Sequence, residues 1–339
     1  MSLLNGIKSF MEYNDKINVS MCPLCQKKEN KTIFKKVRSS GNFTNYDLNE
    51  KLISLDIVLC KNCGFLFRKE LWSNKRQKEY FNKEYKQIYK KRILKNQVLI
   101  NKLKNRKYKE NVSYAKLYLG KNNFFKNNYF TEDETRNEIT INILIKHIGL
   151  SNKSILDVGC GAGGFLKQIK RFKMKKIVGL EPSGEHIANL KKLVKNELSI
   201  YHGTLEDFKE NSNNKFDIIV LNGVIKHFND PLENLKYCHS LLTDDGVLYF
   251  GNAIEEPSIF VNVKKRLSLV AQNYFTYNTY INLFKLSNFK ILYFQKNSHH
   301  ADFIIKKNNN FKDHNPQITR FHYYKLLISF ISQIFSSFL

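Results

Sequence analysis

The sequence predicts an α/β protein with a doubly wound, Rossmann-like sheet that ends in an antiparallel hairpin, preceded by a small zinc-ribbon domain and a helical linker. Three observations lead to this prediction. From Thr131 onward, apolar segments with strand and helix periods alternate regularly, which is typical of a parallel sheet with helices on both faces. A glycine-rich loop follows the first of those strands. Two C-x-x-C pairs lie near the N-terminus.

The 339 residues divide into four predicted segments. Short strands and turns around two cysteine pairs mark residues 1–72 as the zinc-ribbon domain. Residues 73–130 form a basic linker, helical over 73–118, where apolar side chains recur at helical spacing without Gly or Pro. Residues 131–310 form the α/β domain, and residues 311–339 form an amphipathic C-terminal helix.

Within the α/β domain, the pattern places each element in turn. Helices are expected over residues 132–147, from Gly163, over 184–195 and over 231–241. Strands are expected over residues 154–158, 176–181, 198–203, 216–222 and 246–252, followed by a hairpin over 289–295 and 301–307. In such a sheet the carboxyl ends of the parallel strands meet at one edge, which is where ligands bind.

The two cysteine pairs, Cys22 with Cys25 and Cys60 with Cys63, predict a structural zinc site. Each C-x-x-C turn presents two thiolates, and two turns complete a tetrahedral site with no position left for catalysis. The 34 residues between the pairs exceed the usual spacing, and a hairpin can fill that interval. Four reduced core thiols are the alternative, which leaves the spacing unexplained.

The glycine loop follows the strand ending in Val158 and has the sequence Gly-Cys-Gly-Ala-Gly-Gly from Gly159 to Gly164. Glycines let a backbone turn sharply and approach a ligand at a helix N-terminus. Glu181 ends the next strand, where a carboxylate can bind ribose hydroxyls. The loop alone does not separate a nicotinamide dinucleotide from other adenosyl cofactors.

Three further features favour a cationic adenosyl cofactor. Asp157 lies two residues before the first glycine, where it can face a cation and would repel a pyrophosphate. After the third strand, Glu206, Asp207 and Phe208 place acids beside an aromatic ring, a combination suited to adenine. The fourth strand ends in Asn222 and leads into a His-x-x-Asp-Pro turn. The simpler alternatives are that Asp157 caps the following loop and that Glu206 and Asp207 form a solvated helix start.

With these features in order, residues 131–307 resemble the class I S-adenosylmethionine-dependent methyltransferases, and most closely the subgroup with an LDVGCGxG loop and a HxxDP turn. The resemblance implies S-adenosylmethionine as cofactor. It also implies a role for each matching position: the loop at Gly159, Cys160 and Gly161 for the methionine part, Asp157 for its ammonium, Glu181 for the ribose, Asp207 and Phe208 for the adenine, and Asn222 for the methionine side.

His227 is the candidate general base, because it lies just beyond the fourth strand and an alcohol acceptor must lose a proton as it attacks. A purely structural histidine is the alternative. Relatives usually have Glu-His here, whereas this chain has Lys226. Some quinone-directed relatives hold Mg²⁺ with two acids at this turn; Gly223 and Lys226 occupy those positions, so that metal site is absent. Lys226 either attracts an anionic acceptor or is a surface lysine.

The net charge of +26 first suggests nucleic acid, but the composition argues against it. Lysines number 47 and arginines 9, whereas nucleic-acid recognition relies on arginine. A net +12 falls on residues 75–109, where Tyr85 and Tyr89 interrupt the lysines. Cations and tyrosines suit a nucleotide-sugar, so these tyrosines are candidate acceptor contacts; a solvated face with tyrosines in the core is the alternative.

Together, a zinc ribbon followed by this methyltransferase pattern resembles bacterial sugar methyltransferases of antibiotic-sugar and surface-polysaccharide pathways, including capsule. The resemblance implies methyl transfer to a sugar hydroxyl of a nucleotide-sugar or polysaccharide precursor. C-methylation of a keto-sugar, an RNA methyltransferase and a non-catalytic cofactor-binding protein are the alternatives.

A cytoplasmic location is expected, because no secretory signal or apolar membrane span is visible in the sequence. The apolar stripe of the C-terminal helix comprises Leu327, Phe330, Ile331, Ile334, Phe335 and Phe338. It is expected to dock on the body or on a second subunit, with peripheral membrane contact as the alternative.

Overall fold

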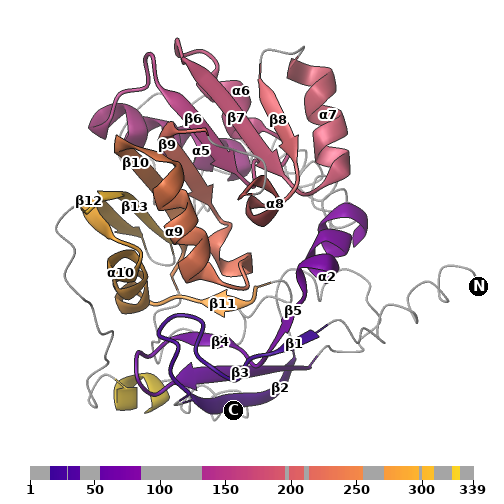
Figure 1. The fold of residues 1–339 in the computed structure, drawn as a ribbon, viewed down its shortest axis with the longest axis vertical. Coiled ribbons are helices and arrows are strands. Elements are labelled where there is room, and N and C mark those ends of the chain that lie inside the picture. Colours follow the sequence, from indigo (N-terminus) through magenta and orange to yellow (C-terminus); the bar gives the residue numbers. More distant parts are fainter. Residues whose placement is uncertain are drawn as a thin grey trace, which may run out of the picture.

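The computed structural model describes residues 16–28, 30–38, 54–84, 132–194, 198–209, 214–254, 271–297, 300–308 and 323–328. In this part of the chain there are two main sheets, one of seven strands and one of four. Figure 1 shows the larger sheet above the smaller one, with α10 and α2 between them.

The seven-stranded sheet confirms the predicted doubly wound, mostly parallel architecture. Its strand order is β12-β13-β10-β9-β6-β7-β8. The parallel strands are β8 (Ser199–His202), β7 (Lys176–Glu181), β6 (Ser154–Val158), β9 (Phe216–Asn222) and β10 (Leu242–Ala253). The antiparallel hairpin is β12 (Phe289–Asn297) and β13 (His300–Lys307). Every residue of β6 is buried, as expected for a central strand covered on both faces.

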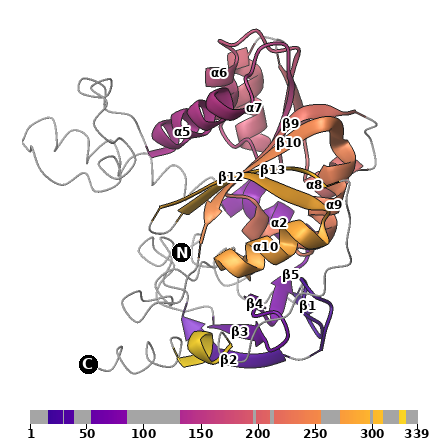
Figure 2. The ribbon, with the colours of Figure 1, turned by 90° about the vertical axis from the view of Figure 1, so that its left-hand side faces the viewer.

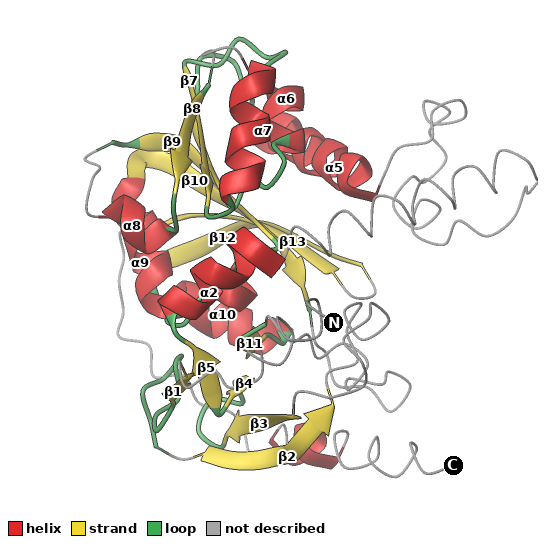
Figure 3. Ribbon diagram, turned by 90° about the vertical axis from the view of Figure 1, so that its right-hand side faces the viewer, coloured by secondary structure: helices red, strands yellow, loops and turns green. Residues whose placement is uncertain are grey.

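Helices cover both faces of this sheet (Figures 2 and 3). One face carries α5 (Glu132–His147), α6 (Gly164–Ile169) and α7 (Gly184–Val194). The other face carries α8 (Leu205–Lys209), α9 (Pro231–Leu241) and α10 (Tyr277–Leu286). The alternative of a helix start at Glu206 and Asp207 corresponds to α8, which has both acids in its first turn. The sequence pattern did not indicate α10, which begins at a capping box formed by Thr276 and Thr279.

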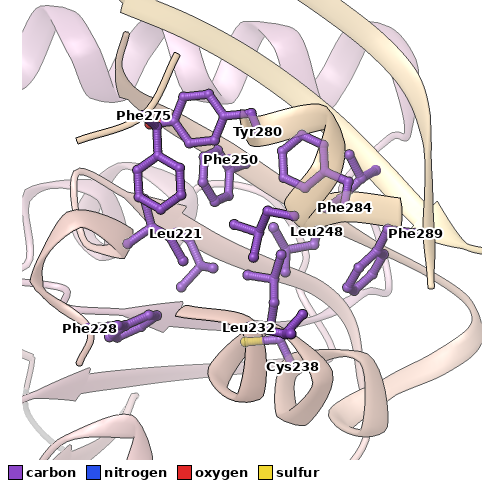
Figure 4. Close-up of a cluster of buried hydrophobic side chains, with 14 of the residues drawn as sticks. Leu221, Phe228, Leu232, Cys238, Leu248, Phe250, Phe275, Tyr280, Phe284 and Phe289 are labelled. Atoms are coloured by element: carbon purple, nitrogen blue, oxygen red, sulfur yellow. The ribbon is translucent and has the colours of Figure 1, made fainter. Parts of the chain in front are cut away.

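Two apolar clusters lie on the two faces of the sheet, because successive strand residues point in opposite directions. On β10, Val247 and Tyr249 belong to the cluster beneath α5, α6 and α7, whereas Leu248 and Phe250 belong to the other. Figure 4 shows this second cluster, in which Phe250 lies among the rings of α10 and the segment before it.

The N-terminal strands form a module that shares a sheet with the α/β part. The N-terminal module consists of β1 (Lys16–Asn18), β2 (Asn30–Arg38), β3 (Ser54–Cys60), β4 (Leu66–Arg68) and β5 (Glu70–Trp72). Its four-stranded sheet has the order β11-β4-β3-β2, and β11 (Asn273–Tyr274) comes from the segment just before α10. The rings of Phe65 and Phe275 pack 4.9 Å apart across this junction. The sequence predicts short strands here but not the shared strand.

A short helical segment leads out of the N-terminal module. Ser73 caps α2 (Asn74–Glu79) by accepting a hydrogen bond from the Arg76 amide, and the π-helical turn η1 (Tyr80–Glu84) follows. Helix is therefore present at the start of the predicted linker. The remainder of that linker lies outside the described residues.

Near the C-terminus, residues 323–328 are helical, and this helix lies beside β2 and β3 (Figures 1 and 2). Leu326 is 1% exposed. Of the predicted apolar stripe, Leu327 falls in this range and the other residues lie outside the described part. Among the described residues, none of the helices combines the length and apolar character needed to span a bilayer.

Candidate active site

The glycine loop turns the chain from the buried strand β6 into α6 at the carboxyl edge of the sheet. Gly159, Gly161 and Gly163 have φ angles of 74°, 55° and 74°, a conformation that favours glycine. A Cβ at Gly163 would lie 2.0 Å from Leu190 Cδ2, so the loop packs directly on α7. Cys160 is buried, and its amide donates to the Leu180 carbonyl, so its side chain belongs to the core beside the loop.

Glu181 braces this loop from the end of β7. Its Oε2 accepts a hydrogen bond of 2.9 Å from the Gly161 amide, and its Oε1 accepts one of 2.9 Å from the Ser183 amide. The side chain is nearly enclosed, with the residue 5% exposed. The spacing between the glycine loop and the acid thus corresponds to a direct contact. A role in binding ribose stays a prediction.

Asp157 lies beneath the loop and is 4% exposed. Burial raises the pKa of its carboxyl group to about 8, and the nearby charge of Glu181 adds to this effect. Two enclosed acids at one loop favour a cationic ligand, because a positive charge would offset their desolvation. Asn222 adds an amide oxygen, Oδ1, that is buried and without a hydrogen-bond partner in the described part of the chain. These groups fit the cationic methionine end of S-adenosylmethionine.

Asp207 has partners on α2 and at the start of α8 that the sequence pattern does not indicate. Its Oδ1 lies 2.6 Å from Lys78 Nζ on α2, and its Oδ2 accepts from the Thr204 amide at the start of α8. Burial opposes ionisation, yet the hydrogen bonds from Lys78 and Thr204 hold the pKa of Asp207 below its usual value. Phe208 is buried in the core with its ring edge-on to Tyr201. Adenine contacts for Asp207 and Phe208 stay predictions.

His227 lies on the single helical turn η3 (Ile225–His227), just beyond the end of β9. Its ring is partly buried and lies edge-on to Phe81 of η1, with 5.7 Å between ring centroids. The backbone on either side is fixed by the segment leading into β11: the Gln272 amide donates to the Lys226 carbonyl, and the Asn273 side chain donates to the Phe228 carbonyl.

The segment from Trp72 to Asn82, which we call the docking segment, runs along the same edge of the sheet. Gln77 donates to Asn229 Oδ1 at 2.8 Å, and the Asn229 amide donates to the Trp72 carbonyl. Asn82 Oδ1 accepts from the Gly184 amide at the start of α7. Polar groups of α2 and η1 therefore make the contacts, while the predicted acceptor residues Tyr85 and Tyr89 lie outside the described residues. The frequent Asn and Gln residues around these turns are the sequence feature that could have indicated these contacts.

The four cysteines of the N-terminal module converge at one point. Their sulfur atoms all lie within 4.8 Å of one another, with Cys22 to Cys63 and Cys25 to Cys60 both at 3.6 Å. These distances are too long for disulfides, and all four thiols are free. A tetrahedral zinc site with Zn–S bonds of about 2.3 Å requires sulfur atoms about 3.8 Å apart, so the cluster fits zinc.

Comparisons with known proteins point to one family. A family model described as a methyltransferase domain matches residues 101–293, more than half of the chain. The chain is similar to a ubiquinone biosynthesis O-methyltransferase of Actinobacillus pleuropneumoniae, with 37% identity over 109 residues that cover 30% of this chain and 46% of that protein. It is also similar to a tRNA U34 carboxymethyltransferase of Campylobacter curvus, with 29% identity over 161 residues that cover 45% of this chain and 49% of that protein. The chain thus spans about half the length of these curated relatives.

Solved structures with a similar arrangement include the PH0226 protein of Pyrococcus horikoshii OT3, with a TM-score of 0.44 and 18% identity over 53% of this chain and 92% of that one. Another is the 1,6-didemethyltoxoflavin-N1-methyltransferase of Burkholderia thailandensis, whose crystal structure contains S-adenosylhomocysteine. It has a TM-score of 0.43 and 18% identity over 52% of this chain and 80% of that one.

Proposed function

The chain belongs to the methyltransferase domain family. We propose that it is a class I S-adenosylmethionine-dependent methyltransferase that methylates a sugar hydroxyl of a nucleotide-sugar or polysaccharide precursor. One observation carries the proposal. The docking segment lies along the carboxyl edge of the sheet, and its Phe81 contacts His227 where an acceptor would approach the cofactor. Residues of the docking segment and of the α/β part would therefore together form the acceptor site.

His227 would act as the general base. S-adenosylmethionine supplies an electrophilic methyl group when bound, so the protein needs chiefly to orient the acceptor and to receive its proton. The imidazole of His227 would take the proton that the attacking hydroxyl loses. The flanking carbonyls of Lys226 and Phe228 are both hydrogen-bonded, which supports a fixed position for the ring.

The residues around His227 favour a sugar over the acceptors named for the relatives. Gly223 and Lys226 stand where quinone-directed relatives carry acids for Mg²⁺, so this turn lacks the carboxylates for that metal. The ring of Phe81 offers an apolar surface for a sugar, and Lys226 offers a cation for a diphosphate. Tyr85 and Tyr89 remain the candidate acceptor contacts from the linker.

We further propose that Cys22, Cys25, Cys60 and Cys63 hold a structural Zn²⁺ as a zinc ribbon. The sulfur distances support a closed tetrahedral site, which leaves no position for substrate. In this role the metal stabilises the N-terminal module and thereby the docking segment.

A methyl-transfer screen tests the acceptor. Purified protein and S-adenosylmethionine are incubated with a panel of nucleotide-sugars, a nucleotide-linked keto-sugar, a quinol and tRNA, and products are read by mass. A gain of one methyl group on a nucleotide-sugar hydroxyl is the expected result. Methylation at a carbon atom of the keto-sugar would assign the protein as a C-methyltransferase in place of an O-methyltransferase. Turnover only on the quinol or on tRNA, the latter falling steeply with salt, would overturn the sugar assignment.

A further inference from the structure

A chain of buried polar groups connects the β10–β13 pair to Asn222 at the cofactor edge. Asn222 Nδ2 donates to Thr140 Oγ1 at 3.3 Å, and Thr140 Oγ1 lies 3.1 Å from Tyr249 OH. Tyr249 OH donates to Asp302 Oδ1 at 2.6 Å, and His300 Nε2 lies 3.1 Å from the same oxygen. Thr140, Tyr249 and Asp302 are each at most 1% exposed.

The strand register explains why these residues meet. Gly251 of β10 pairs with Asn222 of β9 on one side and with Asp302 of β13 on the other. Tyr249 lies two residues before Gly251 and so points to the same face of the sheet, toward Thr140 on α5. A Cβ at Gly251 would lie 2.9 Å from Tyr249 OH and 3.2 Å from Asn222 Oδ1, so glycine leaves the space that these hydrogen-bonded side chains need.

The chemistry of the groups fixes the direction of the hydrogen bonds. Asp302 accepts at Oδ1, while its Oδ2 is buried and has no partner among the described residues. A carboxylate accepts only, so the single phenolic hydrogen of Tyr249 goes to Asp302 and the phenolic oxygen is left to accept. The Thr140 hydroxyl lies within donating distance of two acceptors, Tyr249 OH at 3.1 Å and the Arg136 carbonyl at 3.0 Å. Thr140 in turn accepts from the amide nitrogen of Asn222. Because both neighbours of the Thr140 hydroxyl accept its hydrogen, its oxygen is left to accept from Asn222.

This direction decides which end of the Asn222 amide remains for a ligand. With Nδ2 committed to Thr140, the amide presents Oδ1, which is buried and unpartnered within the described residues. An amide oxygen accepts from an ammonium group, whereas an amide NH₂ in its place would have no bond to offer a cation. Leaving such an oxygen buried without a partner is costly, which favours a ligand that donates to it.

We propose that Asp302 is a positioning residue for the cofactor, holding the Asn222 amide through Tyr249 and Thr140 so that Oδ1 accepts from the ammonium of the methionine part. His300 anchors the far end of the chain by holding the carboxylate of Asp302. The proposal goes beyond the sugar acceptor and does not depend on it. It depends on the cofactor's methionine part lying beside Asn222.

The test compares two ligands that differ in the amino-acid end. Isothermal titration measures the dissociation constants of S-adenosylhomocysteine, which has the ammonium, and of 5′-methylthioadenosine, which lacks it. In Tyr249→Phe we expect the affinity for S-adenosylhomocysteine to fall about ten-fold or more, the value of a hydrogen bond to a charged group. The affinity for 5′-methylthioadenosine should stay within about two-fold.

Two controls separate positioning from loss of fold. Tyr280→Phe removes another buried hydroxyl, one that donates to the Ala253 carbonyl outside this chain of groups, and should change neither affinity. If Tyr249→Phe does not fold, Thr140→Val and Thr140→Ser replace it, since only serine keeps the hydroxyl. The valine variant should then show the selective loss and the serine variant should not. Equal losses for both ligands, or no loss for either, would overturn the proposal.

Discussion

The two sides of the candidate site are assembled in different ways. The loop side is formed by the glycine loop with Asp157 and Glu181. Its residues belong to one strand–helix–strand unit, β6-α6-β7, and Gly161 contacts Glu181 within it. The docked side, formed by η3 and the docking segment, joins residues far apart in the chain, as in the contact between Gln77 and Asn229. The loop side is therefore complete within the α/β part, whereas the docked side depends on the N-terminal module. Perturbing each side should separate cofactor binding from methyl transfer.

Metal removal should have the largest effect and should fall on the docked side. Structural zinc sites in small domains bind with an apparent free energy of about 10–16 kcal/mol that is also folding free energy. Cys60→Ser should therefore lose zinc, unfold the N-terminal module and abolish methyl transfer. Metal analysis, limited proteolysis and the affinity for S-adenosylhomocysteine measure these effects.

Cofactor affinity should largely survive in Cys60→Ser, since the loop side lies in the α/β part. Cys238→Ala, which changes a buried cysteine of the α/β core, should keep the zinc content of the wild-type chain. A fully active, proteolysis-resistant protein without zinc would contradict the assignment.

Replacing the proposed base comes next in size. His227→Ala should lower turnover by about 100- to 10,000-fold, the usual contribution of a general base, while the dissociation constant of the cofactor is unchanged. His239→Ala on α9 is the matched control, since its ring packs against Phe289 away from η3. Turnover of His227→Ala near the wild-type rate would remove this residue as the base.

Asp157 gives the loop side a pH dependence. Its pKa of about 8 in the folded protein lies above the ordinary value, so the folded state holds an extra proton between those two pH values. Stability that this group contributes therefore falls as pH rises from about 4 to about 8, with a slope of about 1.4 kcal/mol per pH unit. In Asp157→Asn this slope should disappear, which urea unfolding at pH 5 and pH 7.5 measures.

The same carboxyl group should release a proton when the cofactor binds near pH 7, because a nearby cation lowers its pKa. Titrations in buffers of different ionisation enthalpy detect the proton. Equal heats in all buffers, together with an unchanged stability slope in Asp157→Asn, would contradict a protonated Asp157.

The ion pair between Lys78 and Asp207 should have the smallest effect, since exposed pairs contribute at most about 1 kcal/mol. Lys78→Met leaves Asp207 Oδ1 open to an adenine amino group, so affinity for the cofactor should rise by up to about five-fold. Lys75→Met on the same helix is the control. An unchanged or weaker affinity for the cofactor in Lys78→Met would mean that Asp207 has a structural role, in its ion pair and helix cap, and does not contact the adenine.

The sequence allowed the loop side to be predicted because its signals are local. Strand and helix periods, the glycine run and the spacing from Gly161 to Glu181 all act within one strand–helix–strand unit. In the structure Glu181 accepts a hydrogen bond from the Gly161 amide, a contact that was not itself predicted. The docked side could not be predicted from local sequence patterns. β11 is two residues long, and Asn273 pairs with Phe67 of β4, far earlier in the chain. The neighbouring hydrogen bond from the Trp72 amide to Gln272 Oε1 spans 200 positions.

The polar chain to Asp302 shows the same limit in a milder form. A single Asp inside the apolar run Ala-Asp-Phe-Ile-Ile of β13 signals a buried polar partner, since a lone charge is costly there. Nothing in the local pattern identifies that partner as Tyr249, which itself lies in a run of apolar residues on β10. The register of three strands was needed to bring them together.

The two-residue strand β11 has a consequence for the order in which the chain matures on the ribosome. The N-terminal module is synthesised first, but its sheet lacks an edge strand until Asn273 and Tyr274 emerge, after most of the α/β strands have been made. During that interval β4 presents an unpaired edge, which is the kind of surface that invites association between nascent chains. Pairing of β11 thus completes the four-stranded sheet late, after its other three strands and most of the α/β strands have been made and before β12 and β13 emerge.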